Sequence, residues 1–234
     1  MHGNLGASSA RSDGEDAGCA LWLGDPAAQD LFDASSLCAQ DREQLRARQG
    51  GRREREFKVS RALKAFTHAD AQSHSLSHSA GHAALLVAPA GMRVGVDLET
   101  LRPRDFLRIA RFAFHEQELR ALEAAAGAER EQMFYVFWTL KEALGKALRL
   151  PLLDALRQCV LTRGAHGWTG TAPTHLPWSA QVFHARPGFF LAAAYVGTDT
   201  PPRVSQWDWP PQRAAEWPVI ACATAPAAAG APPA

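Results

Sequence analysis

Two carboxylates stand two residues apart in the short segment VGVDLE, residues 94–99. On a β-strand successive side chains point to opposite faces, so Asp97 and Glu99 would share one face while Val94, Val96 and Leu98 face a core. Their Cα atoms would lie roughly 6.6 Å apart, at ~3.3 Å rise per residue. Like charges this close repel each other. Either a hard cation such as Mg²⁺, which prefers oxygen ligands, neutralises them, or the strand is a solvated sheet edge.

The strongest helical pattern of the chain covers Met133 to Arg149, with the sequence MFYVFWTLKEALGKALR. Its apolar residues form a stripe of core width, and Glu142 and Lys146 lie opposite that stripe. The two are spaced for a surface ion pair worth a few tenths of a kcal/mol. The aromatic first turns instead favour a helix buried on more than one side, so that both residues line a cleft. Gly145 costs up to ~1 kcal/mol against alanine in mid-helix, and a close contact there would account for it.

Two further segments could hold a phosphate-bearing ligand. A second helix is predicted over 52–66, with a basic surface that is either a solvated face or a phosphate seat. Downstream lies SHSLSHSAGH, residues 73–82, with histidines spaced at four. Its serines favour extended structure, in which residues four apart lie roughly 13 Å from each other, too far to share a zinc ion. No GxSxG motif supports a serine hydrolase. A second basic patch, again either solvated or functional, contains Arg102, Arg104, Arg108 and Arg111.

Length and composition limit the class of protein. The 234 residues, 47% of them hydrophobic, suit one large or two small globular domains. Lys+Arg 25 against Asp+Glu 24 argues against a nucleic-acid partner. Four separated cysteines without a CxxC pair argue against a structural zinc site or a disulfide framework. No apolar run reaches the ~18 residues that span a bilayer, and the polar N-terminus is no secretory signal. We therefore expect a cytoplasmic protein without a membrane partner.

The chain divides by composition into four parts. Residues 1–18 are predicted to be a disordered leader, and the Pro/Ala-rich residues 199–234 a disordered tail in which VSQWDW either docks or stays free. Between them, residues 83–87 and 94–99 are predicted to form a hairpin around Pro89–Gly91. Other predicted strands cover 19–23, 159–162, 168–171, 180–184 and 189–196, and the stretch 102–122 is predicted to become helical.

The motifs together resemble a known family. GVDLE at 95–99, followed about forty residues later by FWTLKEALGKAL at 137–148 and preceded by SLSHS at 75–79, resembles the signature of phosphopantetheinyl transferases of the larger Sfp type. The resemblance covers roughly residues 19–196. It implies an α+β fold, a pseudo-dimer of two similar α/β halves with antiparallel sheets. Residues 19–93 would form the N-terminal half and residues 94–198 the C-terminal half carrying the metal site, with the active site in the cleft between them.

The resemblance also implies an activity. Such an enzyme moves the phosphopantetheine arm of coenzyme A to a serine of an apo acyl or peptidyl carrier protein, with Mg²⁺. By the match, Asp97, Glu99 and Glu142 would hold the metal, Glu142 and Lys146 would be catalytic, and the coenzyme would contact Arg53, Arg61, Ser77 and His78. The chain departs from the family in lacking a Gly-Lys-Pro segment before SLSHS, and in carrying His115 where the family often starts a helix with Ser or Pro.

Two other functions stay open at this point. The chain could be an inactive module that binds the carrier protein or coenzyme A, although the intact set of acids and lysine argues against this. It could also hydrolyse a nucleotide pyrophosphate with the help of a metal. In each case we expect a monomer.

Overall fold

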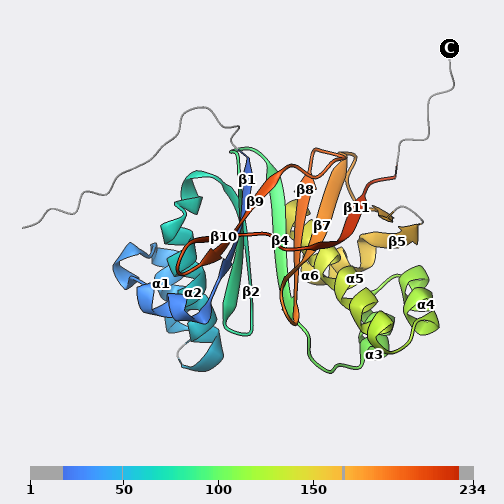
Figure 1. Cartoon of the computed structure of the whole chain (residues 1–234), viewed down its shortest axis with the longest axis horizontal. Coiled ribbons are helices and arrows are strands. Elements are labelled where there is room, and N and C mark those ends of the chain that lie inside the picture. The colour runs from blue at the N-terminus through green and yellow to red at the C-terminus, as the bar shows by residue number, and fades with distance from the viewer. Residues whose placement is uncertain (1–17, 49, 165–166, 227–234) are drawn as a thin grey trace, which may run out of the picture.

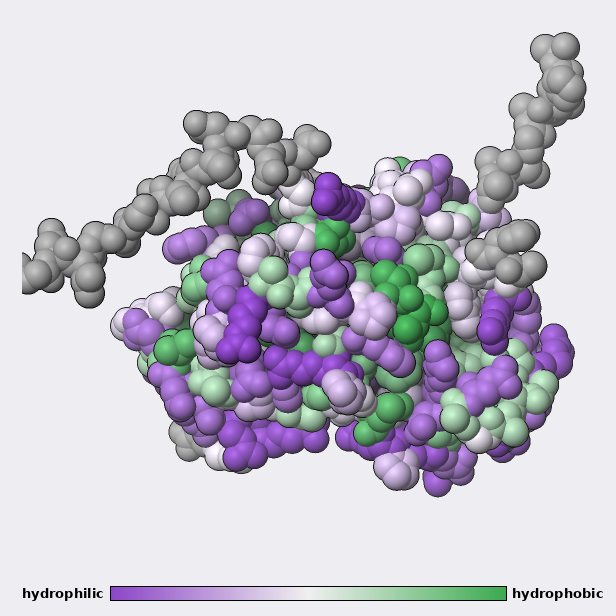
Figure 2. Space-filling model, viewed as in Figure 1, coloured by the Kyte–Doolittle hydropathy of each residue, from purple (hydrophilic) through white to green (hydrophobic). Residues whose placement is uncertain are grey.

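Two β-sheets pack face to face, and a long helix covers the outer side of each (Figure 1). The computed structural model describes residues 18–48, 50–164 and 167–226. The predicted leader therefore lies outside the described residues except for Gly18. Most of the surface seen in Figure 2 is hydrophilic, and apolar residues are confined to small patches.

The first sheet has five strands in the order β10-β9-β1-β3-β2: β10 (Arg213–Ala215), β9 (Val204–Trp209), β1 (Cys19–Gly24), β3 (His82–Ala88) and β2 (Ser73–Ser79). The second has six in the order β4-β8-β7-β11-β6-β5: β4 (Arg93–Thr100), β8 (Phe189–Val196), β7 (Trp178–Arg186), β11 (Val219–Thr224), β6 (Gly167–Thr171) and β5 (Val160–Gly164). Each sheet is antiparallel except for one parallel pair, β1 with β9 and β11 with β6.

Six α-helices complete the described fold: α1 (Ala39–Arg46), α2 (Gly51–Phe66), α3 (Phe106–Ala113), α4 (Glu116–Ala124), α5 (Gly127–Leu148) and α6 (Leu152–Gln158). Three short 3-10 turns lie before α1 and after α2: η1 (Pro26–Leu31), η2 (Ala34–Ser36) and η3 (Ala69–Ala71). No helix among the described residues is both long and apolar enough to cross a membrane.

The two halves repeat one pattern of strands and helices. In the first, β1 leads through α2 to the pair β2 and β3, and β1 pairs with β3. In the second, β4 leads through α5 to the pair β7 and β8, and β4 pairs with β8. Both units therefore have the strand order first, third, second, which confirms the predicted fold of two similar α/β halves.

Strand alternation divides the core into three layers. The apolar side chains of β4 face the other sheet and pack there with residues of β1 and β3. The α2 side of the first sheet buries a second cluster, and the α5 side of the second sheet buries the largest one. The carboxylates of β4 consequently point to the α5 side, as period-2 alternation predicts.

Close approach of β4 to α5 depends on Gly95. A Cβ atom placed there would lie 1.9 Å from the carbonyl oxygen of Ala143, on α5. The expected close contact at Gly145 is also present, because a Cβ there would lie 2.2 Å from Cβ of Ala155 on α6. It is a helix–helix contact rather than space for a ligand.

Two predictions about the chain path are wrong. The turn after β3 does not close a hairpin: β3 pairs with β1 and β2, whereas β4 begins the other sheet and pairs with β8. The sequence signals a reversal but does not specify which strand receives the next one. The tail predicted to be disordered is ordered over 204–224: β11 joins β7, and β9, the VSQWDW segment whose docking the sequence left open, joins β1. There it buries Trp209 and Trp217, apolar side chains that the Pro/Ala-rich composition masked. The last residues of the predicted tail, 227–234, lie outside the described structure.

Candidate active site

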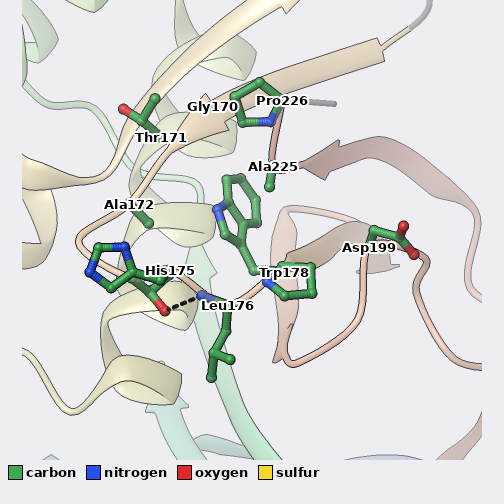
Figure 3. Close-up of a pocket in the computed structure, with 11 residues that line it drawn as sticks. Gly170, Thr171, Ala172, His175, Leu176, Trp178, Asp199, Ala225 and Pro226 are labelled. Carbon is green, nitrogen blue, oxygen red and sulfur yellow. Dashed lines mark hydrogen bonds between the residues drawn. The ribbon is translucent and has the colours of Figure 1, made fainter. Parts of the chain in front are cut away.

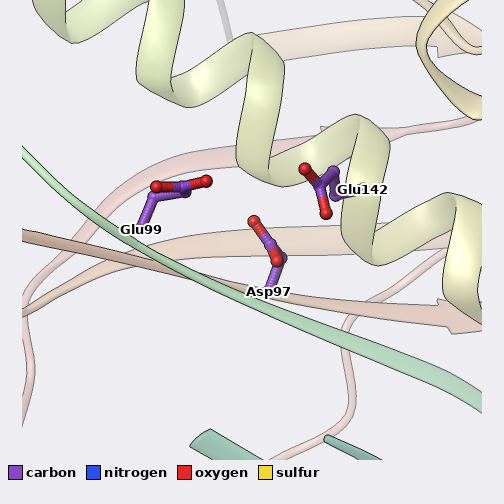
Figure 4. A group of neighbouring side chains, drawn as sticks. All are labelled: Asp97, Glu99 and Glu142. Carbon is purple, nitrogen blue, oxygen red and sulfur yellow. The ribbon is translucent and has the colours of Figure 1, made fainter. Parts of the chain in front are cut away.

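Three carboxylates from two distant segments converge at the interface of β4 and α5 (Figure 4). Asp97, Glu99 and Glu142 each offer an oxygen, and these oxygens lie within 4.8 Å of one another. This is the only group of three or more potential metal ligands found among the described residues. The histidines of the segment 73–82 are not part of it, in agreement with their extended spacing.

The fold places each acid by a different constraint. Asp97 and Glu99 share the α5 face of β4 by alternation, and Asp97 is only 3% exposed. Glu142 projects from the middle of α5, which Gly95 allows to lie directly against the strand. Glu99 accepts a hydrogen bond from Nη2 of Arg104 at 2.9 Å, so one cation already balances part of the cluster.

Lys146 ties the two halves together at this point. Its Nζ donates to Oδ1 of Asp97 at 2.8 Å, to the carbonyl oxygen of Val96 at 2.9 Å and to Oγ of Ser77 at 3.1 Å. Ser77, on β2, in turn donates to Asp97 Oδ1 at 2.9 Å. The three ammonium protons of the lysine are thereby matched by three acceptors. Lys146 thus pairs with Asp97 rather than forming the simple surface pair with Glu142.

Burial and like charge hold protons at the cluster. Burial, with the charge of Asp97 next, raises the pKa of Glu142 to about 8, and Lys146 only partly opposes this. Burial and Asp97 also raise the pKa of Glu99 above its ordinary value, against the opposing effect of Arg104. Carboxylates crowded in a partly dry site favour the protonated form until a cation enters.

The donor set fits a hard divalent cation. Oδ2 of Asp97 is buried and has no hydrogen-bond partner among the described residues, although buried polar atoms are rarely left unpaired. Its second oxygen, Oδ1, is fully engaged by Ser77 and Lys146. Three carboxylates with one orphaned oxygen suit Mg²⁺, which takes oxygen ligands and keeps further positions for water or phosphate.

His78 lies on the other face of β2 from Ser77. Its Nδ1 is 3.5 Å from Oε2 of Glu56, a buried residue of α2. Burial lowers the pKa of His78, Glu56 opposes this, and the cations of Lys146 and Arg48 lower it further. The imidazole is therefore within electrostatic range of Lys146, although it does not touch the acids.

Among the described residues, neither Arg53 nor Arg61 forms a hydrogen bond or an ion pair with the three carboxylates of the cluster. Arg61 donates to Oδ1 of Asp41 at 2.8 Å and lies over the ring of Phe57, with 4.5 Å from its Cζ to the ring centroid. It lines a cavity of about 410 Å³ between α1 and α2 together with Lys64 and neighbouring residues. Arg53 is exposed on α2.

The sequence did not reveal the roles of three residues in or near the site. Glu56 contacts His78 and Arg104 contacts Glu99, but both lie in basic stretches whose only evident feature in the sequence is positive charge. Lys141, next to Glu142, forms a fully buried ion pair with Glu118 of α4. The signal for it was present: a lysine on the apolar side of a helix needs a buried partner.

His115 has a simple local role. It caps the N-terminus of α4, where its Nδ1 accepts a hydrogen bond from the backbone of Gln117 at 3.3 Å and Glu118 completes a capping box. The departure from Ser or Pro at this position therefore still starts the helix, because the imidazole nitrogen replaces a hydroxyl oxygen as acceptor.

The cavity in Figure 3, about 410 Å³, lies elsewhere, around the buried Trp178 and residues of β6 and β7. A hydrogen bond from the backbone of Leu176 to Thr174 Oγ1, at 3.1 Å, shapes one wall. None of the predicted site residues lines it.

Comparison with known proteins agrees with this arrangement. A family model described as the 4′-phosphopantetheinyl transferase superfamily matches residues 93–196, the segment that carries β4, α5 and all three acids. Over these residues, which are less than half of the chain, the protein is similar to the 4′-phosphopantetheinyl transferase superfamily. A curated protein of Synechocystis sp., named "Putative 4'-phosphopantetheinyl transferase slr0495", is similar to the chain with 32% identity over 87 residues. The similarity covers 37% of this chain and 35% of that relative, so the chain matches only about a third of the relative's length.

Proposed function

We propose that this protein transfers the 4′-phosphopantetheine arm of coenzyme A to a serine hydroxyl of an apo acyl or peptidyl carrier protein, with Mg²⁺ at the three carboxylates. The observation that supports this most is the convergence of Asp97, Glu99 and Glu142 within 4.8 Å, with one buried aspartate oxygen left unpaired. The superfamily match covers this segment and supports phosphopantetheine transfer as the reaction.

Phosphoryl-type transfer asks a protein mainly for positioning and charge neutralisation. When bound, the metal would neutralise the pyrophosphate of coenzyme A and draw charge off the leaving group. Ser77 and Lys146 fix Asp97 by hydrogen bonds, so that its free oxygen stays aimed into the site. Arg104 does the same for Glu99.

The attacking serine must lose its proton, and Glu142 is better suited than Glu99 to accept it. Glu99 is held by its ion pair with Arg104, which leaves Glu142 as the less engaged of the two carboxylates. Lys146 stands beside Asp97 and, by exchanging one of its acceptors for a phosphate oxygen, would stabilise charge on the departing bisphosphate.

The carrier protein would dock on α3. The carrier proteins that the family resemblance implies as partners are acidic. The surface of α3 presents Arg108 and Arg111 beside Phe112, which is 68% exposed. A basic surface favours an acidic partner mainly through the association rate. Phe114, at the end of the same helix, is buried against Phe134 and contributes to the core rather than to a docking surface.

The decisive experiment mixes the full chain with coenzyme A, Mg²⁺ and apo carrier proteins, then measures the intact mass of each carrier. A carrier that gains the phosphopantetheine mass supports the proposal, and a chelator should abolish the gain. Asp97→Asn keeps the shape of the side chain but removes a metal ligand, so it should remain folded by circular dichroism and lose turnover. Normal turnover in Asp97→Asn would remove the metal assignment.

The alternatives give different results in the same assay. Coenzyme A binding without any mass gain on the carriers tested would favour a binding module. Release of free phosphopantetheine without a carrier would indicate pyrophosphate hydrolysis. For Lys146→Ala we expect a larger loss in single-turnover rate than in coenzyme affinity, and the reverse pattern would make Lys146 a binding residue only.

A further inference from the structure

A buried carboxylate without a role in the proposed chemistry lies behind His78. Glu56 is 4% exposed, yet it stands on the helix with the most basic surface of the chain. Its Oε1 accepts hydrogen bonds from Nε of Arg52 at 2.7 Å and from the backbone of Gly81 at 3.1 Å. Its Oε2 is left to face Nδ1 of His78 at 3.5 Å. Oε1 of Glu56 therefore holds the β2–β3 turn through Gly81, and Oε2 faces the imidazole of His78.

The cations around this carboxylate outnumber it. Arg52 and His78 contact Glu56 directly, and Arg48 and Lys146 lie near enough to act on the imidazole. The side chains of Arg48, Arg52 and Lys146 therefore bring positive charge to the surroundings of His78, which suits a phosphate group.

The ligand proposed above has a phosphate to fill it. In coenzyme A the pyrophosphate belongs with the metal-binding acids, on the face of β2 that carries Ser77. His78 points to the opposite face of the same strand. The family resemblance implies that the histidine of SLSHS, here His78, lies near the 3′-phosphate on the ribose, and this agrees with the face of β2 on which the imidazole lies.

We propose that Glu56 is a positioning residue: it holds the Nδ1 side of His78 so that Nε2–H of the imidazolium is directed to the 3′-phosphate of coenzyme A. This rests on the proposed function. A carboxylate behind a histidine fixes the ring orientation and stabilises its charged form, as it does for metal-bound and catalytic histidines. The 3.5 Å separation is longer than a hydrogen bond, and such contacts commonly tighten when the ligand arrives.

The test compares two probes and two matched variants. Glu56→Gln keeps the length and the acceptor for Gly81 but removes the charge that faces His78. Glu54→Gln is the control, because Glu54 also sits on α2 in an i,i+4 ion pair, with Lys58, and has no contact with the imidazole. Each variant and the wild type are titrated calorimetrically with coenzyme A and with 3′-dephospho-coenzyme A.

We expect Glu56→Gln to weaken coenzyme A binding about tenfold, the size of one lost charge-assisted interaction. Its affinity for 3′-dephospho-coenzyme A should stay within twofold of the wild type, and Glu54→Gln should change neither. Adding Glu56→Gln to His78→Ala should give no further loss, because the two residues act as one unit. In the transfer assay, Glu56→Gln should raise the KM for coenzyme A by more than it lowers kcat.

Equal losses for both probes would overturn the proposal, since a residue that only holds the β2–β3 turn in place would disturb the binding of both.

A second measurement needs no ligand: the NMR titration of the His78 ring in the free protein. Glu56→Gln should lower the midpoint of that titration, and Glu54→Gln should not. An unchanged midpoint also overturns the proposal. If the wild type binds no coenzyme A at all, the proposed function fails, and the His78 titration still decides whether Glu56 controls the imidazole.

Discussion

Gly95→Ala should separate the metal ligands without altering any of them. The new Cβ would lie 1.9 Å from the carbonyl oxygen of Ala143 and 2.7 Å from the backbone nitrogen of Ala147, both on α5. Ordinary contact begins near 3.4 Å, so β4 and α5 must part by about 1.5 Å. Backbone atoms cannot rotate away as a flexible side chain does. Overpacking of this kind costs about 1–3 kcal/mol of stability.

The larger effect should fall on metal binding. Mg²⁺ demands ligands at about 2.0–2.1 Å in near-octahedral geometry. A shift of about 1.5 Å moves Glu142 away from Asp97 and Glu99 by most of a metal–oxygen bond. We therefore expect at least a tenfold loss of Mn²⁺ or Mg²⁺ affinity, about 1.4 kcal/mol, and a similar or larger loss of transfer activity.

Gly145→Ala is the matched control, on the same helix. Its new Cβ would meet Cβ of Ala155 at 2.2 Å, on the seven-residue α6 rather than on β4. The strain falls between two helices, and the gain of up to ~1 kcal/mol in helix propensity offsets part of it. Urea unfolding and calorimetric metal titration of both variants give the comparison. If Gly95→Ala binds the metal as tightly as the wild type, the close packing of β4 on α5 does not set the site.

Three other predictions concern stability and reactivity. Lys141→Met leaves the carboxylate of Glu118 buried without its cation, so the free energy of unfolding should fall by about 3–5 kcal/mol in urea titrations, and adding Glu118→Gln should restore part of it. Burial alone would raise the pKa of Asp25, but hydrogen bonds from the Ala27 backbone and from Arg186 lower this pKa overall. The ionised Asp25 therefore stabilises the fold fully above the ordinary aspartate pKa. This stabilisation is lost as the pH falls through the lowered pKa of the folded state. Asp25→Asn should therefore show a smaller drop in urea midpoint between neutral pH and about pH 3 than the wild type, and an equal drop would contradict this assignment. Burial raises the pKa of Cys159 to about 12, so iodoacetamide at pH 8 should label the two exposed cysteines of the native protein and leave Cys159 unmodified in peptide mass spectra, whereas rapid labelling of Cys159 would show that the core opens.

The sequence by itself determined the local geometry of the site. Alternation along 94–99 placed Asp97 and Glu99 on one face, and the helical period placed Glu142 and Lys146 on one side of α5; the structure has both arrangements. These features follow from the fixed periods of 2 and 3.6 residues, which need no knowledge of the rest of the chain. The paired motifs also indicated the superfamily whose model matches residues 93–196.

Only the tertiary structure decided which distant segments meet. Lys146 donates a hydrogen bond to Ser77, 69 residues away in the sequence, and Glu56 faces His78. The strand β9 pairs with β1, although the two strands lie near opposite ends of the chain. Strand pairing depends on which sheet edge is left open and which apolar faces remain to be covered, and no local period encodes either choice. For the same reason the supposed hairpin after β3 became a crossing between sheets, and that crossing brings β4, with its two acids, alongside β2 at the junction of the two halves.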